Sequence, residues 1–180
     1  MKKNSGFSLV ELLVVVAIIG VLSGIGVVGF QRYVESAKQK VALQNLDTVV
    51  DFFSTELIIL NNNINNQSSL VKVGNSKWTK ETHNLDSFLT GSAKYHDLGF
   101  GLANFKNPFA NQTIKQVYSL SDANDASNSN LTKKGNIILR VHPDFSTDGS
   151  KIQGDRKFQV IYYSEDNVID ATNTKNFTLK

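Results

Sequence analysis

Several residue types are scarce or missing in this chain, and each absence excludes a class of site. The 180 residues include no cysteine, so disulfides, zinc–thiolate sites, iron–sulfur clusters and thiol nucleophiles are excluded. Proline first occurs at Pro108, so no proline ring interrupts a helix before that position. The formal net charge is +3 and the charges are dispersed, so no nucleic-acid site is evident.

Motifs of enzyme chemistry are missing as well. The sequence has no Gly-x-Ser-x-Gly elbow and no glycine-rich phosphate loop. Its three histidines, His83, His96 and His142, are widely spaced and form no helix-borne metal pair. We therefore predict that the chain is not an enzyme and binds no cofactor.

Hydrophobicity is concentrated near the amino terminus. From Leu12 to Phe30, 19 consecutive residues carry no charge. As a helix they would span about 28 Å, close to the hydrocarbon thickness of a bilayer. No Ala-x-Ala site follows the run, so its removal as an ordinary secretory signal is not expected. Basic residues lie on both sides of it, so the positive-inside rule gives no orientation.

Glu11 lies immediately before this apolar run. A carboxylate inside a spanning helix costs about 2.5–3.5 kcal/mol on insertion scales, which favours a functional role. The alternative is that Glu11 lies near the membrane interface, where its side chain reaches water. The residues themselves do not decide between these two interpretations.

Residues 2–20 begin Lys-Lys-Asn-Ser-Gly-Phe-Ser-Leu-Val-Glu and continue into the apolar run. They resemble the leader and amino-terminal helix of type IV pilins and the related type II secretion pseudopilins. The resemblance is dense over residues 1–30 and continues as a helical pattern to about residue 60. It implies that a prepilin peptidase cleaves between Gly6 and Phe7, and that Phe7 is then N-methylated.

The resemblance also implies how the subunits assemble. Glu11 of one subunit would pair with the amine of Phe7 on a neighbour, because a buried carboxylate is stabilised by an opposite charge. The implied partners are further copies of the chain, the peptidase, membrane lipid before assembly, and an inner-membrane assembly platform with its ATPase. The carboxy-terminal domain would be periplasmic, and the filament would be extracellular or periplasmic.

Three functions agree with this pattern. The first is a structural subunit of a type IV pilus for adhesion, motility or DNA uptake. The second is a pseudopilin of a type II secretion system. The third is a membrane-anchored binding protein that never polymerises. The first is our prediction.

Glycines cluster near the end of the apolar run, at Gly20, Gly24, Gly26 and Gly29. Gly20-x-x-x-Gly24 is a spacing found where two membrane helices pack closely. Each glycine also costs a helix about 1 kcal/mol relative to alanine, which favours local melting. Many family members have proline in this segment, where this chain has Val28. Both packing and melting remain as expectations.

The pattern predicts an α+β fold in which one long helix packs on an antiparallel sheet. The segments are a leader at 1–6, a membrane or filament-core half-helix at 7–30, an amphipathic half-helix at 31–60, and a globular head at 61–180. The head comprises a loop-rich region at 61–116 and a sheet at 117–180. The helix is expected to end in Asn61–Asn63.

The second half of the helix has an apolar stripe at three- and four-residue steps. Its members are Val34, Ala37, Val41, Leu46, Val49, Val50, Phe53, Leu57 and Leu60. Glu56 falls off this stripe. In the head, strands are predicted at 116–120, 136–142 and 157–163, and helical turns around Leu85–Leu89. One face of the sheet is expected to be apolar. The predicted buried anchors of the loop-rich region are Trp78, Leu85, Phe88, Leu89, Leu98, Phe100, Phe105 and Phe109.

Asp144, Asp148 and Asp155 are weak candidates for a calcium site in the connection after the second predicted strand. Their spacing does not match an EF-hand loop, so solvated acidic side chains are the favoured interpretation. Type IV pilins often close their carboxy-terminal loop with a disulfide. Without cysteine, this chain must hold that region by packing, hydrogen bonds or an ion.

Overall fold

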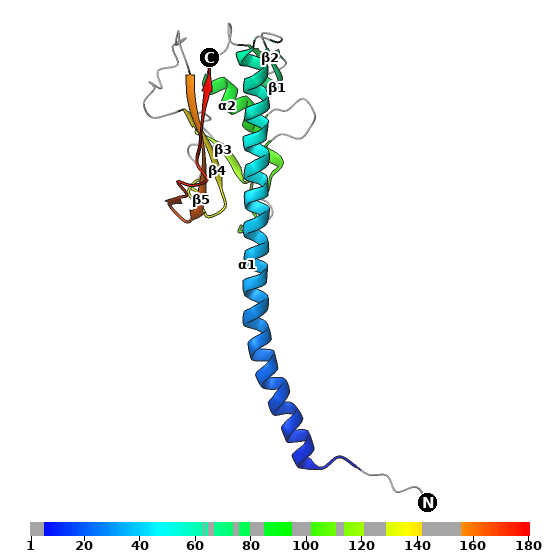
Figure 1. Ribbon diagram of the computed structural model, residues 1–180. Coiled ribbons are helices and arrows are strands. Elements are labelled where there is room, and N and C mark those ends of the chain that lie inside the picture. The colour runs from blue at the N-terminus through cyan, green and yellow to red at the C-terminus, as the bar shows by residue number, and fades with distance from the viewer. Residues whose placement is uncertain are drawn as a thin grey trace, which may run out of the picture. The chain divides into compact units, whose positions relative to one another are not determined.

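The computed structural model describes residues 6–62, 64, 67–73, 76–79, 85–94, 102–110, 114–120, 129–141 and 156–180. The chain divides into two compact units, Met1–Lys38 and Gln39–Lys180. One long helix, α1, begins in the first unit and ends in the second, and all the strands lie in the second (Figure 1). The α+β fold class predicted from the sequence is confirmed.

Helix α1 comprises Leu9–Asn61 and ends inside the predicted asparagine run. The carbonyl oxygens of its last turn accept hydrogen bonds from beyond the helix. The Asn62 N–H donates to the Ile58 oxygen at 3.2 Å, and the Ile64 N–H donates to the Ile59 oxygen at 3.1 Å. Two of the four carbonyls that a helix leaves without an intrahelical partner at its end are therefore satisfied by local backbone contacts.

The buried side of α1 in the second unit follows the predicted stripe, with three differences. Ala42 is buried in place of Val41, which is 47% exposed, and Val50 is only partly buried. Glu56 is fully buried, although its charge placed it on the solvent side. The buried residues of α1 are Ala42, Leu46, Val49, Phe53, Glu56, Leu57 and Leu60.

An unpredicted hairpin accounts for the burial of Glu56. Strands β1 (Gln67–Val73) and β2 (Ser76–Thr79) pair antiparallel, with an irregular register. The Ser68 hydroxyl on β1 donates to Glu56 Oε2 at 2.5 Å and accepts the Val71 N–H at 2.7 Å. The hairpin thus covers a side of α1 that the helical periodicity assigned to water, and it supplies the carboxylate with a donor.

The predicted helical turns form α2, which comprises Leu85–Lys94, and a short 3₁₀ turn follows at Leu102–Asn104. Trp78, Leu85, Phe88 and Leu89 are buried as predicted. Phe105 and Phe109 are partly buried and pack against the core. The other two predicted anchors, Leu98 and Phe100, lie outside the described residues.

The main sheet contains the three strands that the sequence predicted and two that it did not. The predicted strands are β3 (Val117–Ser119), β4 (Ile137–Val141) and β5 (Arg156–Glu165), in that spatial order. Beyond β5, β6 (Val168–Ile169) pairs with the end of β5 and β7 (Lys175–Leu179) pairs with its beginning.

The sheet is mixed, which corrects the prediction of a purely antiparallel sheet. β3 and β4 pair in parallel, with Val117 opposite Ile137, whereas the pairs made by β5 are antiparallel. A parallel pair needs a connection of about a dozen residues or more. The segment 120–136 between β3 and β4 meets this requirement.

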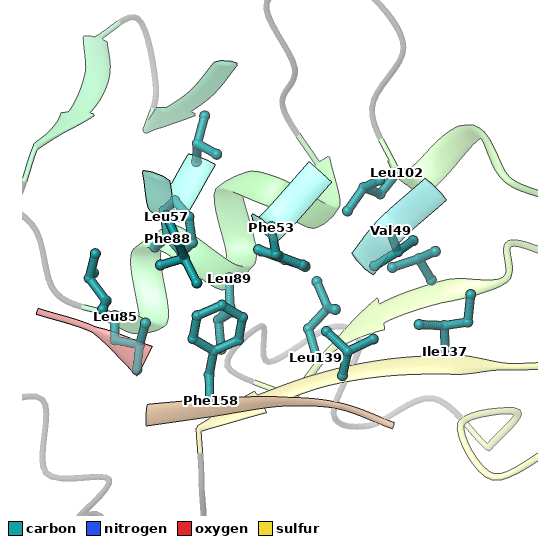
Figure 2. Packing of buried hydrophobic residues seen from close by; sticks show 14 of the residues in the cluster. Val49, Phe53, Leu57, Leu85, Phe88, Leu89, Leu102, Ile137, Leu139 and Phe158 are labelled. Carbon is teal, nitrogen blue, oxygen red and sulfur yellow. The ribbon is translucent and has the colours of Figure 1, made fainter. Parts of the chain in front are cut away.

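The core of the second unit lies between α1, α2 and the sheet (Figure 2). Phe53 of α1 is at its centre: its ring centroid lies 5.0 Å from that of Phe158 on β5 and 5.9 Å from that of Phe88 on α2. Phe88 in turn contacts Trp78, with ring centroids 4.9 Å apart. These contacts join the helices, the hairpin and the sheet into one hydrophobic cluster.

The opposite face of the sheet is also partly apolar, which differs from the prediction of one apolar face. Tyr118, Ile138 and Ile161 are buried there, and Leu131 and Tyr163 pack against them. Leu131 belongs to the segment before β4, so this segment covers the second face. Consecutive residues of β4 are therefore buried on both sides.

Buried side-chain amides connect α1 to the sheet. Gln116 Nε2 donates to the Gly135 oxygen at 2.7 Å and to the Ala42 oxygen at 3.3 Å. Gln116 Oε1 accepts from Asn45 Nδ2 at 2.6 Å. Because both polar atoms of the buried Gln116 side chain are paired inside the protein, these bonds tie the start of β3 to α1.

Asn61 attaches the last strand to the end of α1. Its Nδ2 donates to the Thr178 oxygen at 3.1 Å, and its Oδ1 accepts the Lys180 N–H at 2.8 Å. The amide thus pairs with the edge of β7 as a neighbouring strand would. Hydrogen bonds therefore contribute to holding the carboxy-terminal region, one of the means expected for a chain without cysteine.

We expect Asn61→Ala to loosen the end of β7 and to lower the unfolding free energy by about 1–3 kcal/mol, because two hydrogen bonds are lost. Hydrogen exchange at the amides of β7 measures the effect directly. Asn62→Ala is the matched control, because the Asn62 side chain donates to the Ile58 oxygen of α1 and, among the described residues, makes no bond to β7. Equal protection of β7 in both variants would contradict the attachment.

Candidate functional site

The residues expected at the cleavage site lie outside any helix. Gly6, Phe7 and Ser8 precede α1 in a non-helical segment, and the Phe7 side chain is 90% exposed. A peptidase needs an accessible backbone at the bond that it cuts. The geometry at Gly6–Phe7 meets that requirement, but cleavage and N-methylation remain predictions.

Ser8 and Glu11 form a reciprocal pair at the start of α1. The Ser8 N–H donates to Glu11 Oε2 at 2.7 Å, and the Glu11 N–H donates to Ser8 Oγ at 3.2 Å. This arrangement is a capping box, in which two backbone donors of the first helical turn are satisfied by side chains. It explains why the helix begins at Leu9.

The capping box gives Glu11 a partner inside its own chain. A carboxylate has two oxygens and about four acceptor positions, so the bond from Ser8 leaves capacity for a further donor. Sequence reasoning missed this contact, although Ser8-Leu9-Val10-Glu11 has the required Ser-x-x-Glu spacing.

The apolar half of α1 is uncovered in the structure. From Leu9 to Phe30 every side chain is exposed, and α1 is long and apolar enough to cross a membrane. Exposed apolar surface of this extent marks a membrane or protein contact. By length and composition, this helix could anchor the chain in a membrane.

The four glycines lie inside uninterrupted helix. Apart from the neighbouring backbone of its own helix, a Cβ added at Gly20, Gly24, Gly26 or Gly29 would meet no described atom within 4 Å. Contacts inside the chain therefore do not require glycine at these positions. Gly24 and Gly29 border a shallow groove of about 440 Å³, together with Ile25, Val28 and Arg32. Close packing with another helix and melting in an assembled filament both remain predictions.

The structure does not describe the candidate calcium ligands. Asp144, Asp148 and Asp155 lie outside the described residues, as do the three histidines. In the described part of the chain, no three acidic or histidine side chains are grouped as metal ligands would be. Calcium binding therefore stays untested.

Comparison with known proteins finds a family match at the amino-terminal end of the chain. Residues 1–27 match the model of the prokaryotic N-terminal methylation motif, the leader of type IV pilins and pseudopilins. No curated protein and no solved structure matches the chain significantly. The resemblance found in the sequence is thus confirmed for the leader and the first helical segment.

Proposed function

We propose that the chain is a structural pilin subunit that a prepilin peptidase processes and that then polymerises into a type IV pilus-like filament. The supporting observation is the coincidence of a methylation-motif leader with an apolar helical stretch, residues 9–30, whose side chains are all exposed within the described part of the chain. Lipid covers that helix before assembly, and the same helices of neighbouring copies cover it afterwards. The head is periplasmic before assembly, and the filament extends from the inner membrane.

Glu11 sets the axial offset between neighbouring subunits in this proposal. Cleavage after Gly6 frees the amine of Phe7, and that positive charge stabilises a carboxylate held away from water. The capping box holds one oxygen of Glu11 at Ser8, so the carboxylate has a defined orientation when the amine of the next copy approaches. If neighbouring subunits are out of register, the carboxylate of Glu11 and the amine of Phe7 stay unpaired among apolar side chains, which raises the free energy of the assembly.

The work of assembly comes from other proteins in this proposal. The sequence has no nucleotide-binding loop, so the assembly ATPase and the inner-membrane platform supply the energy. The chain itself contributes the helix that packs against the helices of neighbouring copies and the head that lies outside this helical packing.

We expect Glu11→Ala to abolish or strongly reduce filament yield while membrane insertion stays normal. The substitution removes the charge that pairs with Phe7, and it removes one half of the capping box, worth about 0.5–2 kcal/mol at the helix end. Carbonate extraction measures insertion, and shearing followed by electron microscopy measures filaments. Amino-terminal sequencing of the sheared material should begin at Phe7.

Asp51→Ala is the control, because Asp51 is an exposed acid on the same helix, within the second unit. It should leave filament yield unchanged. Normal yield from Glu11→Ala would refute the pairing. Short filaments confined to the periplasm would favour a pseudopilin, and a protein that stays monomeric in the membrane would favour the non-polymerising binding protein.

A further inference from the structure

A pocket lies in the head where three turns meet, away from the residues involved in the proposed assembly. Its volume is about 430 Å³, within the range of about 300–1,000 Å³ that is usual for small-molecule sites. The turns are residues 107–110, residues 129–135 before β4, and residues 166–167 between β5 and β6. The lining includes Phe109, Ile114, Asn130, Lys133, Lys134 and Asp166.

Hydrogen bonds join the first two turns. Asn107 Nδ2 donates to the Lys134 oxygen at 2.8 Å and to Asn136 Oδ1 at 2.6 Å. Asn107 Oδ1 accepts the Phe109 N–H at 2.8 Å. Asn136 Nδ2 donates to the Asn130 oxygen and, at 3.2 Å, to the Leu131 oxygen. Asn107 and Asn136 are buried, so these bonds are protected from competition with water.

The third turn is joined to the second in the same way. The Asn167 N–H donates to the Thr132 oxygen at 2.6 Å, and the Thr132 hydroxyl donates to Asn167 Oδ1 at 2.5 Å. The Lys134 N–H donates to Asp166 Oδ1 at 2.9 Å. The walls of the pocket are thus fixed before any ligand binds, which reduces the entropic cost of binding.

The lining contains side chains of opposite charge that form ion pairs. Lys133 Nζ lies 2.8 Å from Asp166 Oδ2, and both side chains are about half exposed. This bond from Lys133 holds the pKa of Asp166 below its usual range, with help from the Lys134 N–H. Lys134 Nζ lies 4.8 Å from the centre of the Phe109 ring and 3.0 Å from Glu165 Oε1.

These groups specify the chemistry of a ligand. An ammonium has three donors and a carboxylate about four acceptor positions, so Lys133 and Asp166 can each bind a ligand without breaking their own pair. Lys133 pairs with Asp166 and Lys134 with Glu165, so the charges at the pocket balance. The remaining donor positions of the Lys133 ammonium suit a ligand oxygen that carries negative charge. Phe109 and Ile114 add an apolar wall. A ligand that fits has a carboxylate, hydroxyl donors and a C–H face.

We propose that this pocket binds an acidic sugar, a hexuronic acid. The sugar carboxylate accepts from Lys133, a ring hydroxyl donates to Asp166, and the C–H face of the ring packs on Ile114 and the edge of Phe109. The site is built from the head alone, so it does not depend on whether the chain polymerises.

The test uses the full-length chain in detergent micelles and methyl β-D-glucuronide as the probe. Saturation-transfer NMR should show transfer to the ring protons of this probe. Methyl β-D-glucoside has the same ring without the carboxylate and should bind about tenfold more weakly, because one charge-assisted hydrogen bond is lost. Acetate, which has the charge without the ring, should also bind about tenfold more weakly.

Lys133→Gln should weaken glucuronide binding about tenfold, and Lys133→Arg should retain most of it. Lys40→Gln removes an exposed charge from α1 and is the matched control. Because Lys133 is exposed, its variants should keep the unfolding midpoint of the parent protein, measured by tryptophan fluorescence. The proposal is overturned if the glucoside or acetate binds as tightly as the glucuronide, if Lys133→Gln has no effect, or if the glucuronide shows no transfer.

Discussion

Phe53→Ala is expected to lower the unfolding free energy of the head by about 3–5 kcal/mol, the usual cost of removing a buried aromatic side chain. Phe53 is fully buried, and its ring centroid lies within 6 Å of those of Phe88, Phe158 and Phe177. These rings come from α2, β5 and β7. The substitution therefore leaves a cavity at the point where the helices meet the sheet.

The chain provides its own probe for this measurement. Trp78 is the single tryptophan and is fully buried. Its Nε1 donates to Ser87 Oγ at 3.1 Å, and its ring contacts Phe88. Tryptophan fluorescence during denaturant titration therefore reports the loss of this core.

Two further variants calibrate the result. Ile58→Ala truncates a side chain on the same helix that is 59% exposed, and it should cost less than about 1 kcal/mol. Phe53→Leu keeps most of the volume and should fall between the parent protein and Phe53→Ala. A loss below about 1 kcal/mol for Phe53→Ala would mean that α1 is not packed on the head as described.

Gly135→Ala is expected to destabilise the head by about 2–5 kcal/mol. Gly135 has a φ of 84°, and in the left-handed region a Cβ costs about 1–2 kcal/mol. A Cβ there would also lie 2.5 Å from Phe109 Cδ2 and 2.8 Å from Asn107 Oδ1. Overpacking of this kind adds about 1–3 kcal/mol. The asparagine contacts that hold the three turns would have to shift.

Gly26→Ala is the matched control for this substitution. It adds the same methyl group within a helix, where no described atom apart from the neighbouring backbone of that helix lies within 4 Å, and it should leave the unfolding of the head unchanged. Tryptophan fluorescence compares the two variants, and hydrogen exchange at residues 129–137 localises the effect. If both variants unfold at the same denaturant concentration, the close approach at Gly135 is refuted.

The parts of the fold that the sequence predicted are those governed by local patterns. β4 and β5 are runs of β-branched and aromatic residues, and such runs favour strands. The cleavage motif and the apolar helix are likewise contiguous in sequence. The capping box at Ser8 and Glu11 was equally local, and the Ser-x-x-Glu spacing would have revealed it.

The parts that were missed depend on contacts between distant residues. β7 reads Lys-Asn-Phe-Thr-Leu, a weak strand pattern that becomes a strand by pairing with β5 and by stacking Phe177 on Phe158 at 5.2 Å. The burial of Glu56 depends on a hairpin that follows the helix. The pocket among the three turns depends on asparagines that are far apart in sequence, so periodicity gave no signal of it.

The uncovered helix has a consequence for biosynthesis. Its apolar surface cannot be folded away within the described part of the chain, so a finished polypeptide released into the cytosol would expose it to self-association. The apolar half of α1 therefore needs lipid or another apolar surface to cover it once it is made.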